Sequence, residues 1–381
     1  MSIPTEKQER FHFLDGLRGI AATMIVIHHS FTSYIVNFFD YLGLGFIGSL
    51  ITNFTQSGVE LFFVLSGIVL LRPYLRKQRK FEVGDYFYRR LKRIYPPYLS
   101  SLLLGALIIW IIKAYPSWYS ELWKWTEVSF KNILSQAMII SFNASFYNLA
   151  WWSLGIEVLF YLLVPLIIFI FPAGDRLNNT KIWTLLLCTL IVSVALQLFL
   201  TKFYPDIYNY KHLIINIYQF ICYPVCFLLG ILLAAKDMTI AKARAFIITG
   251  IILIVSSYWY LPIVKPGYGF LYAGFIIFSF NKDSLKRFLS KPVMIWLGER
   301  SYSFFLVHFS VFYFTDYLIS LFRPGRDIYY GILTRGIGIP LALFIAMLLF
   351  TFVEKKYAHG LVTGDIFWPW QVKSLKQFKD K

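Results

Sequence analysis

The feature that most constrains this chain is a series of apolar stretches, each about long enough to cross a bilayer. A hydrocarbon core about 30 Å thick needs about 20 apolar residues in a helix. Ten stretches approach or exceed that length: 19–36, 46–71, 96–113, 149–172, 182–201, 212–235, 244–261, 267–281, 301–321 and 329–353. A further segment, 131–146, has the length of a half-helix and is not counted. The sequence therefore predicts an all-α, polytopic transmembrane bundle of about ten membrane helices.

Composition excludes the soluble and disordered classes of protein. Hydrophobic residues make up 58% of the 381 residues and charged residues only 15%, whereas a soluble domain carries about 25% charged residues. So few polar side chains cannot cover soluble cores, and so many apolar ones do not occur in a disordered chain. We expect one integral-membrane domain over 1–356, followed by a short polar tail over 357–381 on the cytoplasmic side.

The basic residues predict an orientation. The net charge is +17, and most Lys and Arg fall in alternate loops, most densely in 72–93. Cytoplasmic loops of membrane proteins collect Lys and Arg, so we expect both termini in the cytoplasm. In a soluble chain this excess would suggest a nucleic-acid partner, but topology explains it here and we expect none. The basic face suits an anionic ligand or lipid.

The first apolar stretch carries two polar side chains on one helix face. Arg18 and His29 are eleven residues apart, which is about three turns and about 16 Å along the axis of a helix. Arg18 is then expected at the cytoplasmic edge and His29 near the middle of the bilayer. His29 has two interpretations: a packing residue, or a general base whose imidazole titrates near neutrality.

A second group of basic residues has the spacing of an anion site. Arg90 and Arg93 are an i,i+3 pair at the start of the third stretch, so they share a helix face. Arginine is the preferred residue for bidentate phosphate contacts. The nearby basic run 76–80 is explained instead by topology and by contact with anionic lipid.

Three ionisable residues interrupt other apolar stretches, where polar groups are costly and are functional candidates. Glu157 is either a proton-relay or substrate group, or one partner of an ion pair between helices. Glu60 is expected at the outer interface, where its charge would cost little. His308 lies in the ninth stretch. The three cysteines, Cys188, Cys222 and Cys226, have no metal-site spacing, and we expect no metal.

Six short motifs follow one another along the chain. In order they are Asp15–Gly19 with the Arg18-x10-His29 spacing, Gly58–Gly67, Arg90–Arg93, Trp152–Tyr161 with Glu157, Tyr302-Ser303 with His308, and Glu354-Lys355. Together they resemble the acyltransferase-3 family of integral-membrane acyltransferases. Each motif is weak alone, but six in family order are specific. The late motifs depart from the family pattern at Val158, Val307, Ser310 and Lys356.

The resemblance implies transfer of an acyl group, by default acetyl, from acyl-CoA to a hydroxyl of a carbohydrate. The implied acceptor is a cell-surface polysaccharide or its lipid-linked precursor, and the implied location is the cytoplasmic membrane of a bacterium. Acyl-CoA is a substrate here, and no tightly bound cofactor is implied. The implied catalytic residues are His29 and Glu157. The implied acyl-CoA phosphate ligands are Arg18, Arg90 and Arg93, and the supporting residues are Asp15, Glu60, Ser66, Ser153, Tyr302 and His308.

Two other classes of function also place polar residues in membrane helices. One is a transporter or flippase for a glycan or lipid, and the other is a non-catalytic component of polysaccharide export. Transporters often show inverted repeats with helices broken at matching positions. The sequence shows no such repeat, which favours the enzyme.

Overall fold

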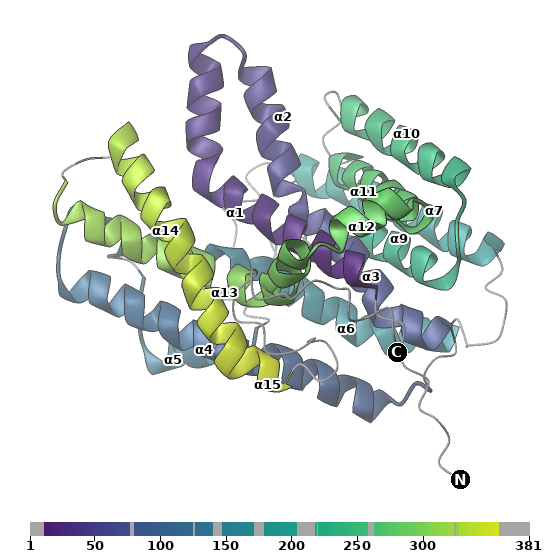
Figure 1. Ribbon diagram of the computed structural model, residues 1–381, viewed down its shortest axis with the longest axis horizontal. Helices are drawn as coiled ribbons and strands as arrows, with labels where there is room; N and C mark the ends of the chain where they lie inside the picture. Colours follow the sequence, from purple (N-terminus) through teal and green to yellow (C-terminus); the bar gives the residue numbers. More distant parts are fainter. Residues whose placement is uncertain are drawn as a thin grey trace.

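The chain is helical throughout the part that the structure describes (Figure 1). This computed structural model describes residues 11–357 apart from 77–79, 125, 140–146, 171–178, 204–217, 219, 258–262, 324 and 326. These residues form helices, turns and short connections, and no strand occurs among them. The all-α prediction is confirmed.

Six α-helices and two short 3-10 helices occur among the described residues of the first half. They are α1 (His12–Tyr41), α2 (Gly45–Gln56), α3 (Gly58–Leu75), α4 (Val83–Ala114), η1 (Ser120–Trp123), α5 (Phe130–Ala137), η2 (Leu149–Trp151) and α6 (Trp152–Ile170).

The described part of the second half continues with further α-helices and has a π-helical turn near its end. Its elements are α7 (Asn179–Phe203), α9 (Pro224–Ala235), α10 (Ile240–Ser256), α11 (Val264–Asn281), α12 (Asp283–Leu289), α13 (Pro292–Ser320), α14 (Ile328–Leu349), the π-helical η5 (Phe350–Glu354) and α15 (Lys355–Tyr357).

Seven helical segments are long and apolar enough to cross a membrane among the described residues. They are His12–Tyr41, Gly45–Leu75, Val83–Ala114, Leu149–Phe169, Trp183–Leu200, Pro292–Ser320 and Ile328–Tyr357. The polytopic architecture is thus confirmed, whereas the count of about ten is not. The three other expected stretches correspond to α9, α10 and α11, which are helical but fall short of that length or apolarity. The first part of the expected stretch 212–235 lies outside the described residues.

Several helices begin earlier than their apolar stretches. α1 starts at His12, so Arg18 and His29 lie on one continuous helix. α4 starts at Val83, which places Arg90 and Arg93 inside it. The expected stretch 46–71 is divided into α2 and α3 by a turn at Ser57. Hydropathy misses these additions because they are polar, although the backbone continues as helix.

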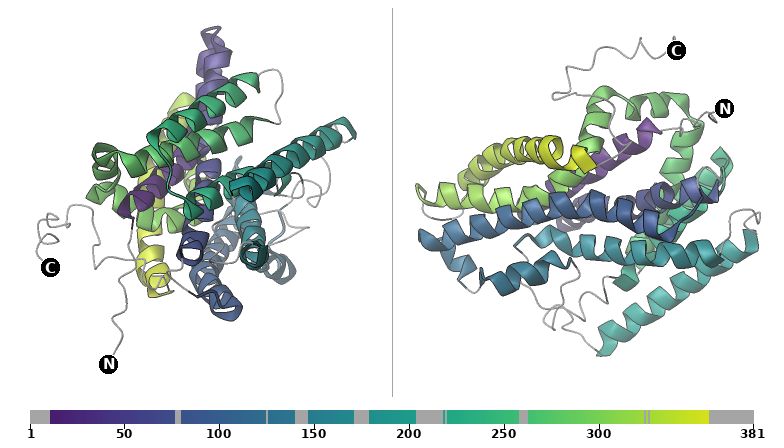
Figure 2. Two further views of the ribbon diagram at one scale, coloured as in Figure 1. Left: turned by 90° about the vertical axis from the view of Figure 1, so that its right-hand side faces the viewer. Right: turned by 90° about the horizontal axis from the view of Figure 1, so that it is seen from below.

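The bundle is organised around α1, which packs on α13 and on α3. α13 also runs beside α14, α3 packs on α9, and α10 pairs with α11 (Figure 2). Close approach of α1 and α13 depends on small residues, as in many membrane helix pairs. A Cβ at Gly19 would collide with the backbone of Gly298, and one at Gly298 with the backbone of Asp15.

The outer helices expose apolar side chains, as a bilayer-facing surface requires. Examples on α4, α7 and α10 are Leu103, Trp110, Ile191 and Ile252, all more than half exposed. In Figure 1, α1 and α2 form a hairpin that rises above the other helices.

Parts of the sequence-based predictions fall outside the described residues. The segment expected as a half-helix contributes α5 up to Ala137, and 140–146 is not described. The predicted tail is described only at Tyr357. The cytoplasmic location of both termini stays a prediction.

Candidate active site

One pocket lies between α1, α3, α4, α6 and α13, and it collects most of the predicted site residues. The space inside it, counted out to its open mouth, is about 840 Å³. Its predicted members are Arg18, Ser66, Arg90, Arg93, Ser153, Glu157 and Tyr302. The rest of its wall is Ile25, Val59, Phe62, Phe63, Leu65, Val69, Leu70, Ile94, Tyr161 and Phe305.

Three arginines from two helices line this pocket. Arg18 comes from α1, and Arg90 and Arg93 come from successive turns of α4. In the part of the chain that the structure describes, their guanidinium groups have no hydrogen bond or ion pair, and Arg90 only packs on the Tyr86 ring at 5.8 Å. Half-buried cations without partners favour a bound anion, because an unpaired charge away from water is costly.

Glu157 lies in the same pocket and is held by two hydroxyl groups. Its Oε1 accepts hydrogen bonds from the Tyr161 hydroxyl and from the Ser66 hydroxyl, the latter at 3.4 Å. The sequence predicted Glu157 and Ser66, and the structure brings them together across α6 and α3. Tyr161, one turn after Glu157, was not selected from the sequence, although the i,i+4 spacing was a signal.

Two supporting residues connect the pocket wall to neighbouring backbone. The Tyr302 hydroxyl on α13 donates to the carbonyl of Ile94 at 3.1 Å, directly after Arg93. The Ser153 hydroxyl donates to the carbonyl of Ala150 at 3.4 Å. Tyr302 therefore fixes the α4 turn that carries Arg93.

His29 lies one turn beyond the pocket along α1. Ile25 lines the pocket, and His29 follows it at i+4 on the same helix face. The His29 ring stacks on the His308 ring, with centroids 5.5 Å apart and planes inclined by 20°. It also contacts the Phe309 ring at 4.4 Å. The structure thus brings together two histidines that are 279 residues apart in the sequence.

His308 is fully buried, and its own helix fixes its orientation. Its Nδ1 donates to the carbonyls of Phe305 at 2.8 Å and Phe304 at 3.2 Å. Its Nε2 has no hydrogen-bond partner among the described residues. Because Phe305 lines the pocket, α13 also runs from the pocket wall to the histidine pair in one turn.

The neighbouring residue, His28, packs against α2 instead of joining the histidine pair. Its Nδ1 lies 3.1 Å from the carbonyl of Thr52 and 3.3 Å from the hydroxyl of Thr55, both on α2. The Thr32 hydroxyl lies 3.2 Å from the same nitrogen. Adjacent residues on a helix point about 100° apart, so His28 faces α2 while His29 faces α13.

Two predicted supporting residues lie outside the pocket wall. Asp15 lies in the first turn of α1, where its backbone packs closely against Gly298. Glu60 is only 4% exposed, and its Oε2 has no hydrogen-bond partner among the described residues. Its side chain is therefore enclosed by neighbouring helices, and α9 and α11 pack on α3. The expected position of Glu60 at the outer interface stays a prediction.

Two charged residues that the sequence analysis did not select also form a buried contact. Arg335 on α14 pairs with Asp316 on α13, with N–O distances of 3.1 and 3.3 Å. Both interrupt apolar stretches, which was the available signal. Within the described residues, no three His, Cys, Asp or Glu side chains come together as metal ligands would.

Comparison with known proteins identifies the family. The acyltransferase-3 family, described as an acyltransferase domain, matches residues 11–353. The chain is 25% identical to acyltransferase MdmB of Streptomyces mycarofaciens, over 79% of each chain. It is 26% identical to O-acetyltransferase OatA of Staphylococcus aureus, over 93% of this chain and 56% of that protein. It is 24% identical to peptidoglycan O-acetyltransferase OatA of Listeria monocytogenes, over 90% of this chain and 54% of that protein. No solved structure matches.

The chain therefore belongs to the acyltransferase-3 family of membrane O-acyltransferase enzymes. It spans about half the length of the OatA proteins. Family membership confirms the resemblance inferred from the six motifs, and it favours the enzyme over the transporter and the export component.

Proposed function

We propose that this chain transfers an acyl group, by default acetyl, from acyl-CoA to a hydroxyl of a cell-surface polysaccharide or its lipid-linked precursor. The observation that carries the proposal is the pocket itself. Three arginines that have no ion pair among the described residues line it. Two of its wall helices, α1 and α13, continue to a pair of histidines within one turn.

The donor half of the proposal rests on charge and shape. Coenzyme A presents phosphate groups, and Arg18, Arg90 and Arg93 offer planar guanidinium donors that suit them. Apart from the arginines, Glu157, two serines and two tyrosines, the wall is apolar, with Ile25, Phe62 and other such side chains. The apolar part of the wall suits the pantetheine arm and a short acyl group, because neither carries a charge.

In the proposed reaction, His29 acts as a general base and accepts the proton of the acceptor hydroxyl. As the hydroxyl oxygen attacks the thioester carbonyl, a C–O bond forms, the C–S bond breaks, and the coenzyme A thiolate leaves. The proton taken by His29 then passes to that thiolate. General-base assistance of this kind contributes typically about 10²- to 10⁴-fold. Glu157 lines the pocket with the arginines, so we assign it to orienting the donor site rather than to the acceptor proton.

The acceptor half of the proposal rests on the relatives. The Listeria relative is named a peptidoglycan O-acetyltransferase, so peptidoglycan is the first acceptor to test. The relatives are bacterial, and we assign the chain to the cytoplasmic membrane. With the arginine end facing the cytoplasm, where acyl-CoA is made, His29 near the middle of the bilayer could receive an acceptor from outside.

The experiment compares base-labile O-acyl groups on surface glycans of the parent strain, a deletion strain and three complemented strains. A deletion strain is complemented with wild type, with His29→Ala, or with His28→Ala as the adjacent control, all at matched membrane levels. We expect wild type and His28→Ala to restore the acyl groups and His29→Ala to fail. The mass of the released acid names the acyl group. Full restoration by His29→Ala would end the proposed role of His29, and no glycan change in the deletion strain would exclude a surface-glycan acceptor.

A further inference from the structure

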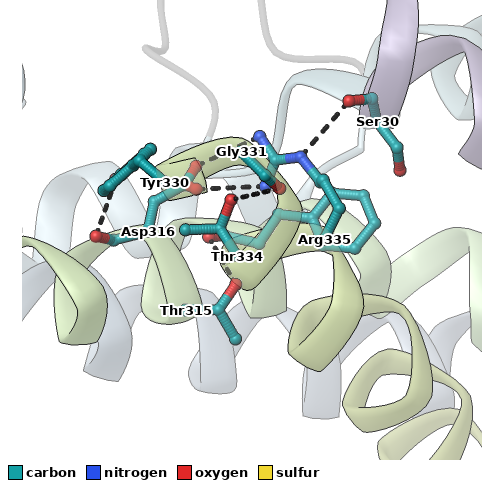
Figure 3. Close-up of polar contacts among 8 residues, drawn as sticks. Ser30, Thr315, Asp316, Tyr330, Gly331, Thr334 and Arg335 are labelled. Carbon is teal, nitrogen blue, oxygen red and sulfur yellow. Dashed lines mark hydrogen bonds and ion pairs between the residues drawn. The ribbon is translucent and has the colours of Figure 1, made fainter. Parts of the chain in front are cut away.

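A buried ion pair joins two membrane helices close to the histidine pair, and neither donor docking nor proton transfer explains it. The Arg335 guanidinium binds both carboxylate oxygens of Asp316 (Figure 3). The side chains are only 16% and 10% exposed. Removing two charges from water is costly, and such pairs often add little to stability over apolar residues of similar size. Their presence in membrane segments therefore points to another role.

The same guanidinium has a third contact, on α1. Its Nε donates to the carbonyl of Ser30 at 3.3 Å (Figure 3), and Ser30 directly follows His29. One turn earlier in α14, the helix comes close enough to α1 that a Cβ at Gly331 would collide with the Tyr34 hydroxyl. Arg335 therefore connects α14 with both α13 and the part of α1 that carries His29.

Ring contacts on α13 link Arg335 back to His29, so that the contacts form a closed ring of neighbouring residues. The Arg335 guanidinium lies over the Phe312 ring at 5.0 Å. The Phe312 ring meets the His308 ring edge to face at 5.8 Å, and the His308 ring stacks on His29. His29 thus contacts His308, which contacts Phe312, which contacts Arg335. Arg335 in turn binds the carbonyl of Ser30, the residue after His29.

We propose that Arg335, with Asp316, is a positioning residue for His29: it holds the His29 turn of α1 against the His308 ring of α13. The proposal rests on the proposed function in one respect, namely that His29 acts on the acceptor hydroxyl. A displacement of about 1 Å in a catalytic group can cost about 10²-fold in rate. Losing one guanidinium contact can therefore reduce turnover without disturbing the donor site.

The experiment uses the full chain in detergent or nanodiscs, with acetyl-CoA as donor and peptidoglycan fragments as acceptor. The test variants are Arg335→Lys and Asp316→Asn. Lysine keeps the positive charge, but it lacks the planar fork that binds Asp316 and the Ser30 carbonyl together. The control is Arg323→Met, which removes an ion pair to Asp327 from the connection between α13 and α14.

Three quantities are measured for each variant: kcat by thiol release, the Kd of acetyl-CoA, and the carbethoxylation rate of His29 relative to His28 by mass spectrometry. We expect Arg335→Lys to lower kcat about tenfold or more, to leave Kd within about twofold, and to raise the relative modification rate of His29. The control should leave all three quantities at wild-type values.

The outcomes separate this proposal from the proposed function. An unchanged kcat, or equal losses of kcat and donor affinity, would assign Arg335 to general stability and overturn the proposal. An unchanged modification rate of His29 would overturn it as well. If His29→Ala keeps full activity, the proposed chemistry fails, while the modification rate still shows whether Arg335 holds the imidazole.

Discussion

The donor site makes a sharp prediction because two adjacent arginines on α4 differ in their contacts. Arg90 lines the pocket, and its guanidinium has no hydrogen bond or ion pair in the described structure. Arg89 is bonded to Asp85 and to the Tyr74 hydroxyl, and it is not part of the pocket wall. Arg90→Ala should therefore weaken acyl-CoA binding, and Arg89→Ala should not.

The expected size follows from the kind of contact. A hydrogen bond to a charged group contributes about 1.5–3 kcal/mol, and about 1.4 kcal/mol corresponds to a tenfold change in Kd. Arg90→Ala should raise the Kd of acyl-CoA about ten- to hundredfold, and Arg93→Ala should do the same. Arg89→Ala removes a partly exposed i,i+4 ion pair, worth about 0.3–0.5 kcal/mol of stability, and its Kd should stay within about twofold.

The assay is isothermal titration of the purified protein with acetyl-CoA at one fixed salt concentration. Repeating it at higher salt should weaken wild-type binding, because part of the attraction is screened. Arg90→Ala should lose less affinity over the same range, since one charged contact is already missing. Equal Kd values for Arg90→Ala, Arg93→Ala and wild type would refute the docking scheme.

Three further predictions concern other parts of the bundle. Glu157→Gln should lower kcat about tenfold or more without weakening acetyl-CoA binding; a rise in Kd would show that the carboxylate helps to bind the donor. Gly298→Ala should lower stability by about 1–3 kcal/mol because its Cβ would overlap the backbone of α1, whereas Gly336→Ala, with open space around it, should gain about 0.5–1 kcal/mol; equal melting temperatures would contradict this packing. His28→Ala should cost about 0.5–1.5 kcal/mol through its lost bond to α2 and keep kcat; a loss of turnover at matched protein levels would place His28 in the chemistry.

The pocket could be predicted from the sequence to the extent that helical spacing determines it. Arg18 and His29 share a face because eleven residues complete about three turns, and the Arg90 and Arg93 pair follows from the same rule. Contacts between distant helices could not be derived in this way. No periodicity relates Glu157 to Ser66, or His29 to His308, because tertiary packing alone brings them together.

The predicted number of spans exceeds the seven candidate spans among the described residues, and a physical reason is available. Hydropathy measures transfer into lipid, and α9 and α11 are apolar because other helices bury them. Buried helices and lipid-facing helices have similar composition, so a window of residues does not distinguish them. The pairing of Arg335 with Asp316 could not be predicted either. In the sequence each charge is an isolated interruption of an apolar stretch, and only the packing of α14 on α13 brings the two together.

The location of Arg18, Ile25 and His29 on one uninterrupted helix limits how this segment can vary during evolution. The apolar side chains between Arg18 and His29 can be exchanged as long as their volumes suit the neighbouring helices. Their number cannot change, because one inserted residue would turn His29 by about 100° and move it about 1.5 Å along the axis. The histidine would then take the position of Ser30 and no longer face His308 on α13. Point substitutions in this segment are therefore compatible with function, whereas insertions and deletions are not.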